Sequence, residues 1–159
     1  MILRRATAAD APGIVALWND VIARTAITFT TEPKTIPGIT ADIAARGDGF
    51  MVVEEDGQLL GFATYFPFRG GPGYAFTKEH SVILSPAARG RGMGRALMMQ
   101  LANAARREGV HSLWAGVSGE NPGGVRFHAA LGFREIATLP EVGFKFGRWM
   151  DLVLMQKIL

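Results

Sequence analysis

Apolar residues recur along this chain at two spacings, and these separate its helices from its strands. Between residues 11 and 24, Ile14, Leu17, Trp18 and Val21 follow one another at intervals of one or three residues. This is the pattern of an amphipathic helix, and Asp10 is placed to cap it. The same pattern predicts a long helix over residues 92–108, and shorter helices are predicted over residues 38–46 and 122–131.

Shorter apolar runs bounded by turn residues predict strands. They cover residues 2–6, 50–54, 58–66, 79–84, 112–117, 133–137 and 151–158. Asp56-Gly57 joins the second and third runs and is a strong signal for a two-residue hairpin. The resulting order, β-α-α-β-β-β-α-β-α-β-β, predicts an α/β (α+β) fold in which helices cover a mixed sheet. No repeat or linker divides the chain, so we expect a single domain over residues 1–159.

Composition narrows the class of protein. Hydrophobic residues make up 48% of the chain and charged residues 19%, which suits a globular protein with a sizeable core. The absence of cysteine excludes disulfides, a cysteine nucleophile and a cysteine-based metal site, and we expect no metal cofactor. No segment has the apolar length of a signal peptide or of a membrane span, so we expect a cytoplasmic protein that does not bind membranes.

The net charge of +3 is mild, but three arginines gather in one glycine-rich segment, Arg89-Gly90-Arg91-Gly92-Met93-Gly94-Arg95. The segment lies between a predicted strand and a predicted helix. Backbone N–H groups and the helix dipole at such a junction form a cradle for an anion, and glycines allow the anion to approach closely. The spacing lacks the lysine of a P-loop and the third glycine of a dinucleotide-binding fingerprint. No aromatic residues alternate with the arginines, so we expect a phosphate-bearing small ligand and no nucleic acid.

The spacing R-x-x-G-x-G, here Arg89, Gly92 and Gly94, resembles the pyrophosphate loop of the GNAT superfamily of acetyl-CoA-dependent N-acetyltransferases. "KEHSVILSPAARGRGMGRAL", "GENPGGVRFHAALGF" and "VGFKFGRWMDLVLMQ" resemble its phosphinothricin and methionine sulfoximine acetyltransferase branch. The resemblance runs over nearly the whole chain. It implies a mostly antiparallel sheet whose two central strands, residues 79–84 and 112–117, splay apart. The pantetheine arm of acetyl-CoA would lie in that gap against Val82, Ile83 and Leu84, and the backbone of residues 89–95 would hold the pyrophosphate.

The chemistry of acetyl transfer requires a group that removes a proton from the acceptor ammonium. Glu79 begins the strand that carries the cofactor and matches the glutamate position of the branch, so we expect it to be the general base; its alternative is a solvated acid at a strand end. A backbone N–H of Val82 or Ile83 would stabilise charge on the thioester carbonyl. His128 occupies the place where many GNAT enzymes have a tyrosine. It would either protonate the departing thiolate or hydrogen-bond its sulfur, and the alternative is a histidine that packs in the helix. His80 alternates to the strand face opposite Glu79 and is expected to be structural.

Other positions are assigned by the resemblance. Asn121 can cap the following helix and contact the pantetheine arm. Lys145 and Trp149 fall in a segment G-x-K-x-G-x-W-x-D and would line the acceptor pocket, partly across a dimer; a core role for Trp149 is equally compatible. The branch carries an acceptor-binding arginine before the glutamate, within a segment that here reads Ala75-Phe76-Thr77-Lys78-Glu79. Alanine stands in its place, which leaves Arg69 or Lys78 as substitutes and makes amino-acid recognition less secure than acetyl transfer.

These features predict an enzyme that acetylates the amino group of a small amino-acid-like acceptor, such as methionine sulfoximine, phosphinothricin or methionine sulfone. Acetylation of another amine, a polyamine or a protein N-terminus, is the alternative within enzymes. A non-catalytic acyl-CoA-binding sensor is the alternative outside them, and Glu79 argues against it. The resemblance also implies a homodimer. The apolar C-terminal strand "DLVLMQKIL" alternates poorly, which suits burial on both faces.

Overall fold

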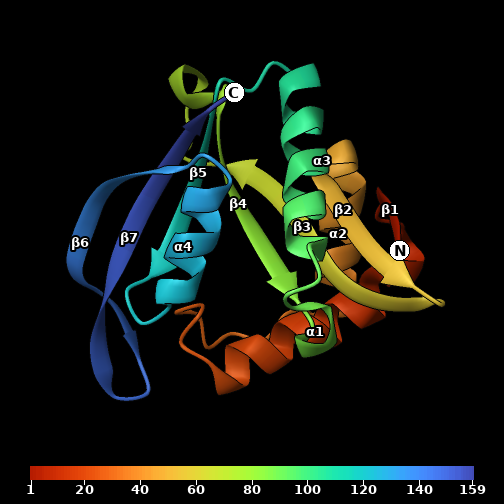
Figure 1. Cartoon of the computed structure of the whole chain (residues 1–159), viewed down its shortest axis with the longest axis horizontal. Helices are drawn as coiled ribbons and strands as arrows, with labels where there is room; N and C mark the ends of the chain where they lie inside the picture. The colour runs from red at the N-terminus through yellow and green to blue at the C-terminus, as the bar shows by residue number, and fades with distance from the viewer.

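A computed structural model describes residues 1–159 and contains one seven-stranded sheet in the order β1-β2-β3-β4-β5-β7-β6 (Figure 1). Only β4 and β5 pair in parallel, and all other neighbours are antiparallel. The strands are β1 (Ile2–Arg5), β2 (Phe50–Glu55), β3 (Gln58–Pro67), β4 (Thr77–Leu84), β5 (Ser112–Ser118), β6 (Arg134–Lys145) and β7 (Arg148–Ile158). The predicted order of elements and the mixed, mostly antiparallel sheet are confirmed.

Four α-helices cover the two faces of the sheet: α1 (Ala11–Arg24), α2 (Ile36–Arg46), α3 (Met93–Arg107) and α4 (Pro122–Ala130). Helix α2 begins two residues before the prediction because Thr35 caps it, its side chain accepting a hydrogen bond from the N–H of Gly38. None of the helices is both long and apolar enough to cross a membrane.

Alternate residues of β4 divide the core between the two faces. Ile83 packs with residues of α1 and α2 such as Trp18 and Ile39. Val82 and Leu84 pack against the larger cluster that holds Leu97 and Leu101 of α3. By the same alternation, Glu79 and Ser81 face α1 and α2, whereas Lys78 and His80 face α3 and α4. His80 therefore lies on the face opposite Glu79, as the two-residue period predicts.

The β6–β7 hairpin is much longer than the predicted strands at residues 133–137 and 151–158. Pro140 and Gly143 interrupt the apolar pattern, and the pairing absorbs them through a register shift between Leu139 and Gly143. Phe146 and Gly147 both have positive φ, 54° and 73°, which suits a tight two-residue hairpin turn. The hairpin extends the sheet well beyond the length of the other strands (Figure 1).

The two central strands separate soon after they meet. β4 and β5 pair only at Thr77, Lys78 and Glu79, which lie opposite Ser112, Leu113 and Trp114. Beyond Glu79, β4 stays paired with β3 and β5 stays paired with β7, so a gap opens within the sheet. The predicted splay of the central strands is confirmed.

Candidate active site

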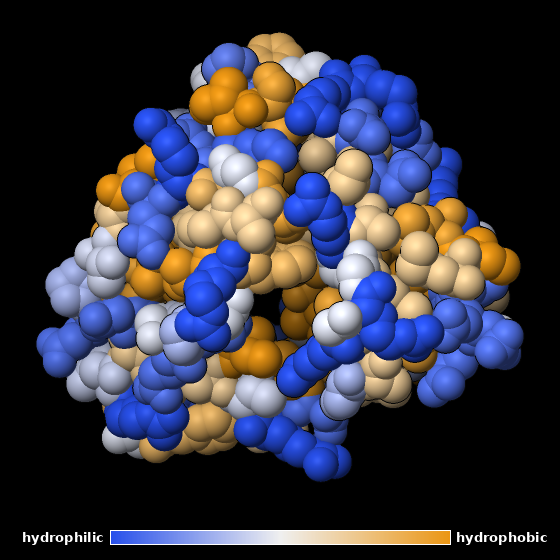
Figure 2. Space-filling model, viewed as in Figure 1, coloured by the Kyte–Doolittle hydropathy of each residue, from blue (hydrophilic) through white to orange (hydrophobic).

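A cavity of about 920 Å³ occupies the gap between β4 and β5. Its walls come from both splayed strands, the N-terminal ends of α3 and α4, α2 and the segment that follows α1. Figure 2 shows this face hollowed near its centre, with hydrophobic side chains inside the hollow and hydrophilic ones around its rim. The shape suits a long ligand with an apolar middle and polar ends.

The open edge of β4 offers backbone groups to this cavity. The N–H of Ser85 donates to the carbonyl of Leu60, so odd-numbered residues of β4 form the hydrogen-bonded pairs with β3. The N–H and C=O groups of Val82 and Leu84 consequently point toward β5, which has already diverged. Of the two predicted donors to a thioester carbonyl, Val82 has its N–H on the open edge, whereas the N–H of Ile83 belongs to the β3 ladder.

The glycine-rich loop forms the other end of the cavity. None of the backbone N–H groups from Gly90 to Arg95 donates to a backbone carbonyl of the protein. Gly90 and Gly92 have positive φ, 72° and 76°, and a Cβ on Gly94 would lie 2.9 Å from Leu84 and 3.1 Å from the ring of Phe127. Successive free amides at a helix N-terminus are the cradle that a pyrophosphate requires.

The arginines of this loop differ in their placement. Arg89 and Arg95 line the cavity. The Arg91 side chain instead turns away and pairs with Glu55, 2.7 Å from Nη2 to Oε2. Met93 is buried in the core, so only its backbone is available to a ligand.

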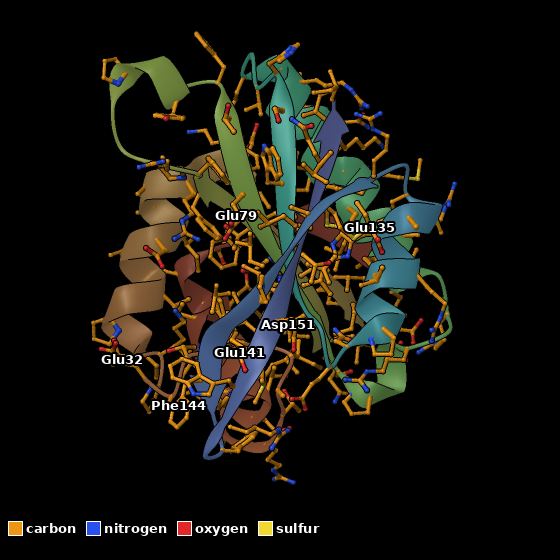
Figure 3. The ribbon with its side chains drawn as sticks, turned by 90° about the vertical axis from the view of Figure 1, so that its left-hand side faces the viewer. Glu32, Glu79, Glu135, Glu141, Phe144 and Asp151 are labelled. Carbon is orange, nitrogen blue, oxygen red and sulfur yellow. The ribbon has the colours of Figure 1, made fainter.

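Glu79 is the last residue of β4 that pairs with β5, so it lies where the gap between these strands begins (Figure 3). Burial raises the pKa of its carboxyl group above the ordinary range, and no charged or hydrogen-bonding neighbour offsets that effect. Gly116 on β5 leaves room beside it, since a Cβ there would come within 4.0 Å of Glu79 Oε1 and 3.4 Å of Leu152. A half-buried, unpaired carboxyl group with a raised pKa is suited to accept a proton near neutral pH.

His128 is buried and engaged through both ring nitrogens. Its Nδ1 lies 2.8 Å from the carbonyl of Gly124 and must donate to it, because a carbonyl oxygen only accepts. Its Nε2 lies 2.9 Å from Nε2 of His80. Burial lowers the pKa of both histidines, and that of His80 falls to about 3. In the neutral pair His80 therefore donates to His128, which has no N–H left for a ligand.

Asn121 caps α4, because its Oδ1 accepts a hydrogen bond of 3.0 Å from the N–H of Gly124. The residue also lines the cavity. The capping role expected from the sequence is confirmed, and contact with the pantetheine arm remains a prediction.

A family model described as "Acetyltransferase (GNAT) family" matches residues 14–133. The chain belongs to the GNAT family. It is therefore an acetyltransferase.

Relatives resemble this GNAT enzyme over almost their whole length. The L-methionine sulfoximine/L-methionine sulfone acetyltransferase of Salmonella typhimurium is 38% identical over 98% of this chain and 93% of its own. The phosphinothricin N-acetyltransferase of Streptomyces coelicolor is 34% identical over 93% of this chain and 90% of its own. Both names agree with the branch that the sequence motifs indicate.

Two solved structures superpose closely on this GNAT enzyme. An acetyltransferase from Salmonella typhimurium, solved with its cofactor acetyl-CoA, has a TM-score of 0.95 and 38% identity, and the match covers 100% of this chain and 94% of that one. A ribosomal-protein-alanine N-acetyltransferase from Brucella melitensis has a TM-score of 0.94 and 39% identity over 100% of both chains. The fold and the family are thus established together.

The residues expected to bind the acceptor lie apart from one another in this GNAT enzyme. Ala75, Phe76 and Thr77 do not line the cavity, and Phe76 is 63% exposed. Trp149 is 60% exposed and packs against Phe144, with ring centroids 4.9 Å apart. Of the predicted set, only Glu79 borders the cavity directly.

Lys145 acts on the cavity indirectly. Its side chain is 2% exposed, and Nζ donates to the carbonyls of Thr25 and Thr28 at 2.8 Å each. These carbonyls belong to the segment after α1, which lines the cavity through Thr28, Phe29 and Thr30. Phe29 also packs directly on Gly143, where a Cβ would lie 2.5 Å from its ring. Lys145 therefore fixes a cavity wall to the β6–β7 hairpin.

Several cavity residues escape prediction from the sequence. They are Trp18, Thr28, Phe29, Arg46, Ser81 and Gly116. Ser81 could have been found, since it shares a strand face with Glu79 at a spacing of two. Arg46 and Phe29 could not, because their place in the cavity wall depends on how α2 and the segment after α1 pack across the sheet.

Proposed function

We propose that this enzyme transfers the acetyl group of acetyl-CoA to the amino group of a small amino-acid-like acceptor of the methionine sulfoximine, methionine sulfone and phosphinothricin class. The observation that carries the proposal is Glu79: an unpaired, half-buried carboxyl group at the point where β4 and β5 separate. The names of relatives that align over nearly the whole chain support the acceptor class.

The residues around the gap fit acetyl-CoA. The free amides from Gly90 to Arg95 would hold its pyrophosphate, helped by the side chains of Arg89 and Arg95. Val82 and Leu84 would pair with its pantetheine arm as a neighbouring strand does, and Asn121 lies within reach on the opposite wall. When bound, acetyl-CoA would supply an activated thioester, to whose carbonyl carbon an amine can add, with cleavage of the C–S bond and departure of CoA as its thiolate.

Glu79 would take the proton of the acceptor ammonium, directly or through a water, because only the free amine is a nucleophile. The N–H of Val82 would donate to the thioester carbonyl oxygen as negative charge develops there. Both ring nitrogens of His128 are already engaged, so we assign His128 a positioning role for α4 in place of proton donation.

We also propose that residues 1–159 act as one catalytic domain, that the enzyme works in the cytoplasm where acetyl-CoA is supplied, and that it is a homodimer. The last proposal is supported by apolar side chains that the β6–β7 hairpin leaves exposed. They are Ile136, Leu139, Val142, Phe144, Phe146 and Trp149. A second copy of the chain would cover them.

A second candidate is acetylation of a protein N-terminus. It is favoured by one observation, the name of the 39% identical Brucella melitensis structure.

An acceptor screen separates the two candidates. Purified enzyme is mixed with acetyl-CoA, and thiol release is followed with methionine sulfoximine, methionine sulfone, phosphinothricin, spermidine and a peptide with N-terminal alanine. We expect release with the three amino-acid analogues. Release with the peptide or the polyamine alone would reject the proposed acceptor and leave the acetyltransferase.

A further inference from the structure

One arginine stands apart among the cations that line the cavity. Arg89 and Arg95 belong to the glycine-rich loop, and Lys34 places its Nζ 4.5 Å from the centroid of the Trp18 ring. Arg46, the last residue of α2, lies on the same face of the sheet as Glu79. Its side chain is only 22% exposed.

The protein uses only some of the hydrogen-bond donors of the Arg46 guanidinium. Its Nη1 donates to Thr64 Oγ1 at 3.1 Å, and its Nη2 lies 3.4 Å from Asp42 Oδ2. The guanidinium carbon lies 5.3 Å from the centroid of the Phe66 ring. An arginine carries five N–H donors in a planar fork, so donors remain for a ligand. Burial lowers the pKa of Arg46, and the charge of Asp42 offsets this effect only in part. The positive charge of Arg46 is therefore buried and only partly balanced within the protein.

The strand register places this fork over the β3 residues that pair with the Glu79 segment of β4. Phe66 lies directly opposite Glu79 in the β3–β4 ladder, and Thr64 lies opposite Ser81. Directly opposed residues of an antiparallel pair project to the same face and are close neighbours. Arg46 contacts Phe66 and Thr64, so its guanidinium borders the cavity from the same sheet face as the Glu79 carboxyl group. An α-amino acid bound between them would present its amino group to Glu79 and its carboxylate to Arg46.

The other nearby cations do not reach the same space. Lys78 is adjacent to Glu79 in the chain and therefore projects to the opposite face. Arg69 lies in the loop after β3 outside the cavity, with its guanidinium 5.5 Å from the centroid of the Tyr74 ring.

We propose that Arg46 binds the α-carboxylate of the acceptor and makes the enzyme selective for α-amino acids over amines that lack a carboxylate. This inference rests on the proposed function and assigns the group that recognises its acceptor. Arg46 replaces, from another element, the arginine that is missing at Ala75.

The test compares two acceptors that differ only in the carboxylate: methionine sulfone and its α-carboxamide. Wild type, Arg46→Met, Arg46→Lys and Arg69→Met are assayed by thiol release, and calorimetry with acetyl-CoA checks that each variant is folded. For methionine sulfone, Arg46→Met should lower kcat/KM by about 10- to 100-fold, mainly through KM, as expected for a lost charge-assisted hydrogen bond. The carboxamide should be affected less than about threefold, and Arg46→Lys should lie between, because lysine keeps the charge but loses the fork.

Arg69→Met is the matched control and should behave as wild type with both acceptors. Equal losses with both acceptors in Arg46→Met, no loss at all, or a carboxylate-specific loss in Arg69→Met would overturn the assignment. If Arg46→Met does not fold, Arg46→Lys decides: unchanged selectivity would reject the proposal. If wild type acetylates methionine sulfone and its carboxamide equally, the role of Arg46 is rejected but the proposed function stands. If wild type acetylates neither of these but acetylates a peptide, the proposed function itself is rejected.

Discussion

We propose Glu79 as the general base because it borders the cavity and because burial raises its pKa. A base must be deprotonated, so kcat/KM should fall as the pH decreases through the pKa of Glu79, at a higher pH than for an ordinary glutamate. Glu79→Gln should lower kcat/KM at neutral pH by roughly 10²–10⁴-fold and abolish this acidic limb. The loss should shrink at alkaline pH, where free amine is abundant.

Steady-state thiol release between pH 5 and 10 measures both effects, and acetyl-CoA affinity serves as the folding control. A Glu79→Gln enzyme with wild-type rates at pH 7 would reject Glu79 as the base.

The His80–His128 pair makes the stability of the fold depend on pH. Folded His80 stays neutral down to a pKa of about 3, because burial and the neighbouring His128 both disfavour its charge. The unfolded chain binds that proton below about pH 6.5. The free energy of unfolding should therefore fall as the pH is lowered through this window, by about 1.4 kcal/mol per pH unit for His80.

Thermal unfolding between pH 7.5 and 5 checks this dependence. His80→Gln keeps a donor for His128 but does not titrate, so its Tm should fall less steeply than that of wild type. His111→Gln changes an exposed histidine and should follow wild type. Parallel curves for all three proteins would contradict the prediction.

At the scale of single residues, the sequence predicts best where chemistry and local geometry coincide. The glycines at 90, 92 and 94 are predictable because a strand end followed by a helix N-terminus is a local arrangement, and Glu79 is predictable because it matches a position of the branch motif. The cap at Asn121 is local for the same reason. Arg46 and the buried tether of Lys145 are not predictable, since each joins elements that are distant in the chain.

Among the elements, the loop before α3 holds Gly92 in a left-handed conformation at the border of the cavity. Its φ is 76°, and a Cβ there would meet nothing within 4 Å. Gly92→Ala should therefore fold, with a loss of about 1–2 kcal/mol for the left-handed conformation. The added methyl group would lie in the anion cradle, so calorimetry should show acetyl-CoA affinity reduced by roughly tenfold or more.

Gly109 provides the matched control for this substitution. It follows α3 at the opposite end, has φ of 80° and has equally open space around its Cβ position. Gly109→Ala should lose similar stability yet bind acetyl-CoA as wild type does. Equal affinities for the two variants would argue against pyrophosphate binding at the loop.

Elements with a regular period were predicted within a few residues, whereas the β6–β7 hairpin was not. Residues 138–150 contain Pro140, Gly143 and a run of apolar side chains on an exposed surface. The alternation of apolar and polar residues that predicts a strand arises when one face of the strand is buried. In a single copy of this chain, most of β6 is exposed on both faces. The sheet accommodates the irregularity by shifting register, which depends on pairing with β7 and leaves little trace in the local sequence.

For the whole molecule, the exposed side of this hairpin should hold two copies together. Phe144 and Trp149 are 54% and 60% exposed, and Phe144 lies at the outer part of the hairpin (Figure 3). We expect wild type to sediment as a dimer at micromolar concentration and a Phe144→Glu/Trp149→Glu variant to sediment as a monomer. Met99→Glu, at an equally exposed position on α3, should remain dimeric. A monomeric wild-type protein would reject this interface.

The buried amine of Lys145 gives such an assembly a thermodynamic consequence. Its backbone belongs to the hairpin, and its Nζ donates to carbonyls of the segment that forms one wall of the cavity. Whatever orders the hairpin therefore also orders that wall, and the two equilibria are coupled. Coupling free energies are reciprocal, so acceptor should tighten subunit association by the same factor by which association tightens acceptor binding. Subunit concentration and amino-acid concentration would then be two variables of one binding polynomial. Acetyl-CoA, which we propose is bound by β4 and α3, would take little part in it.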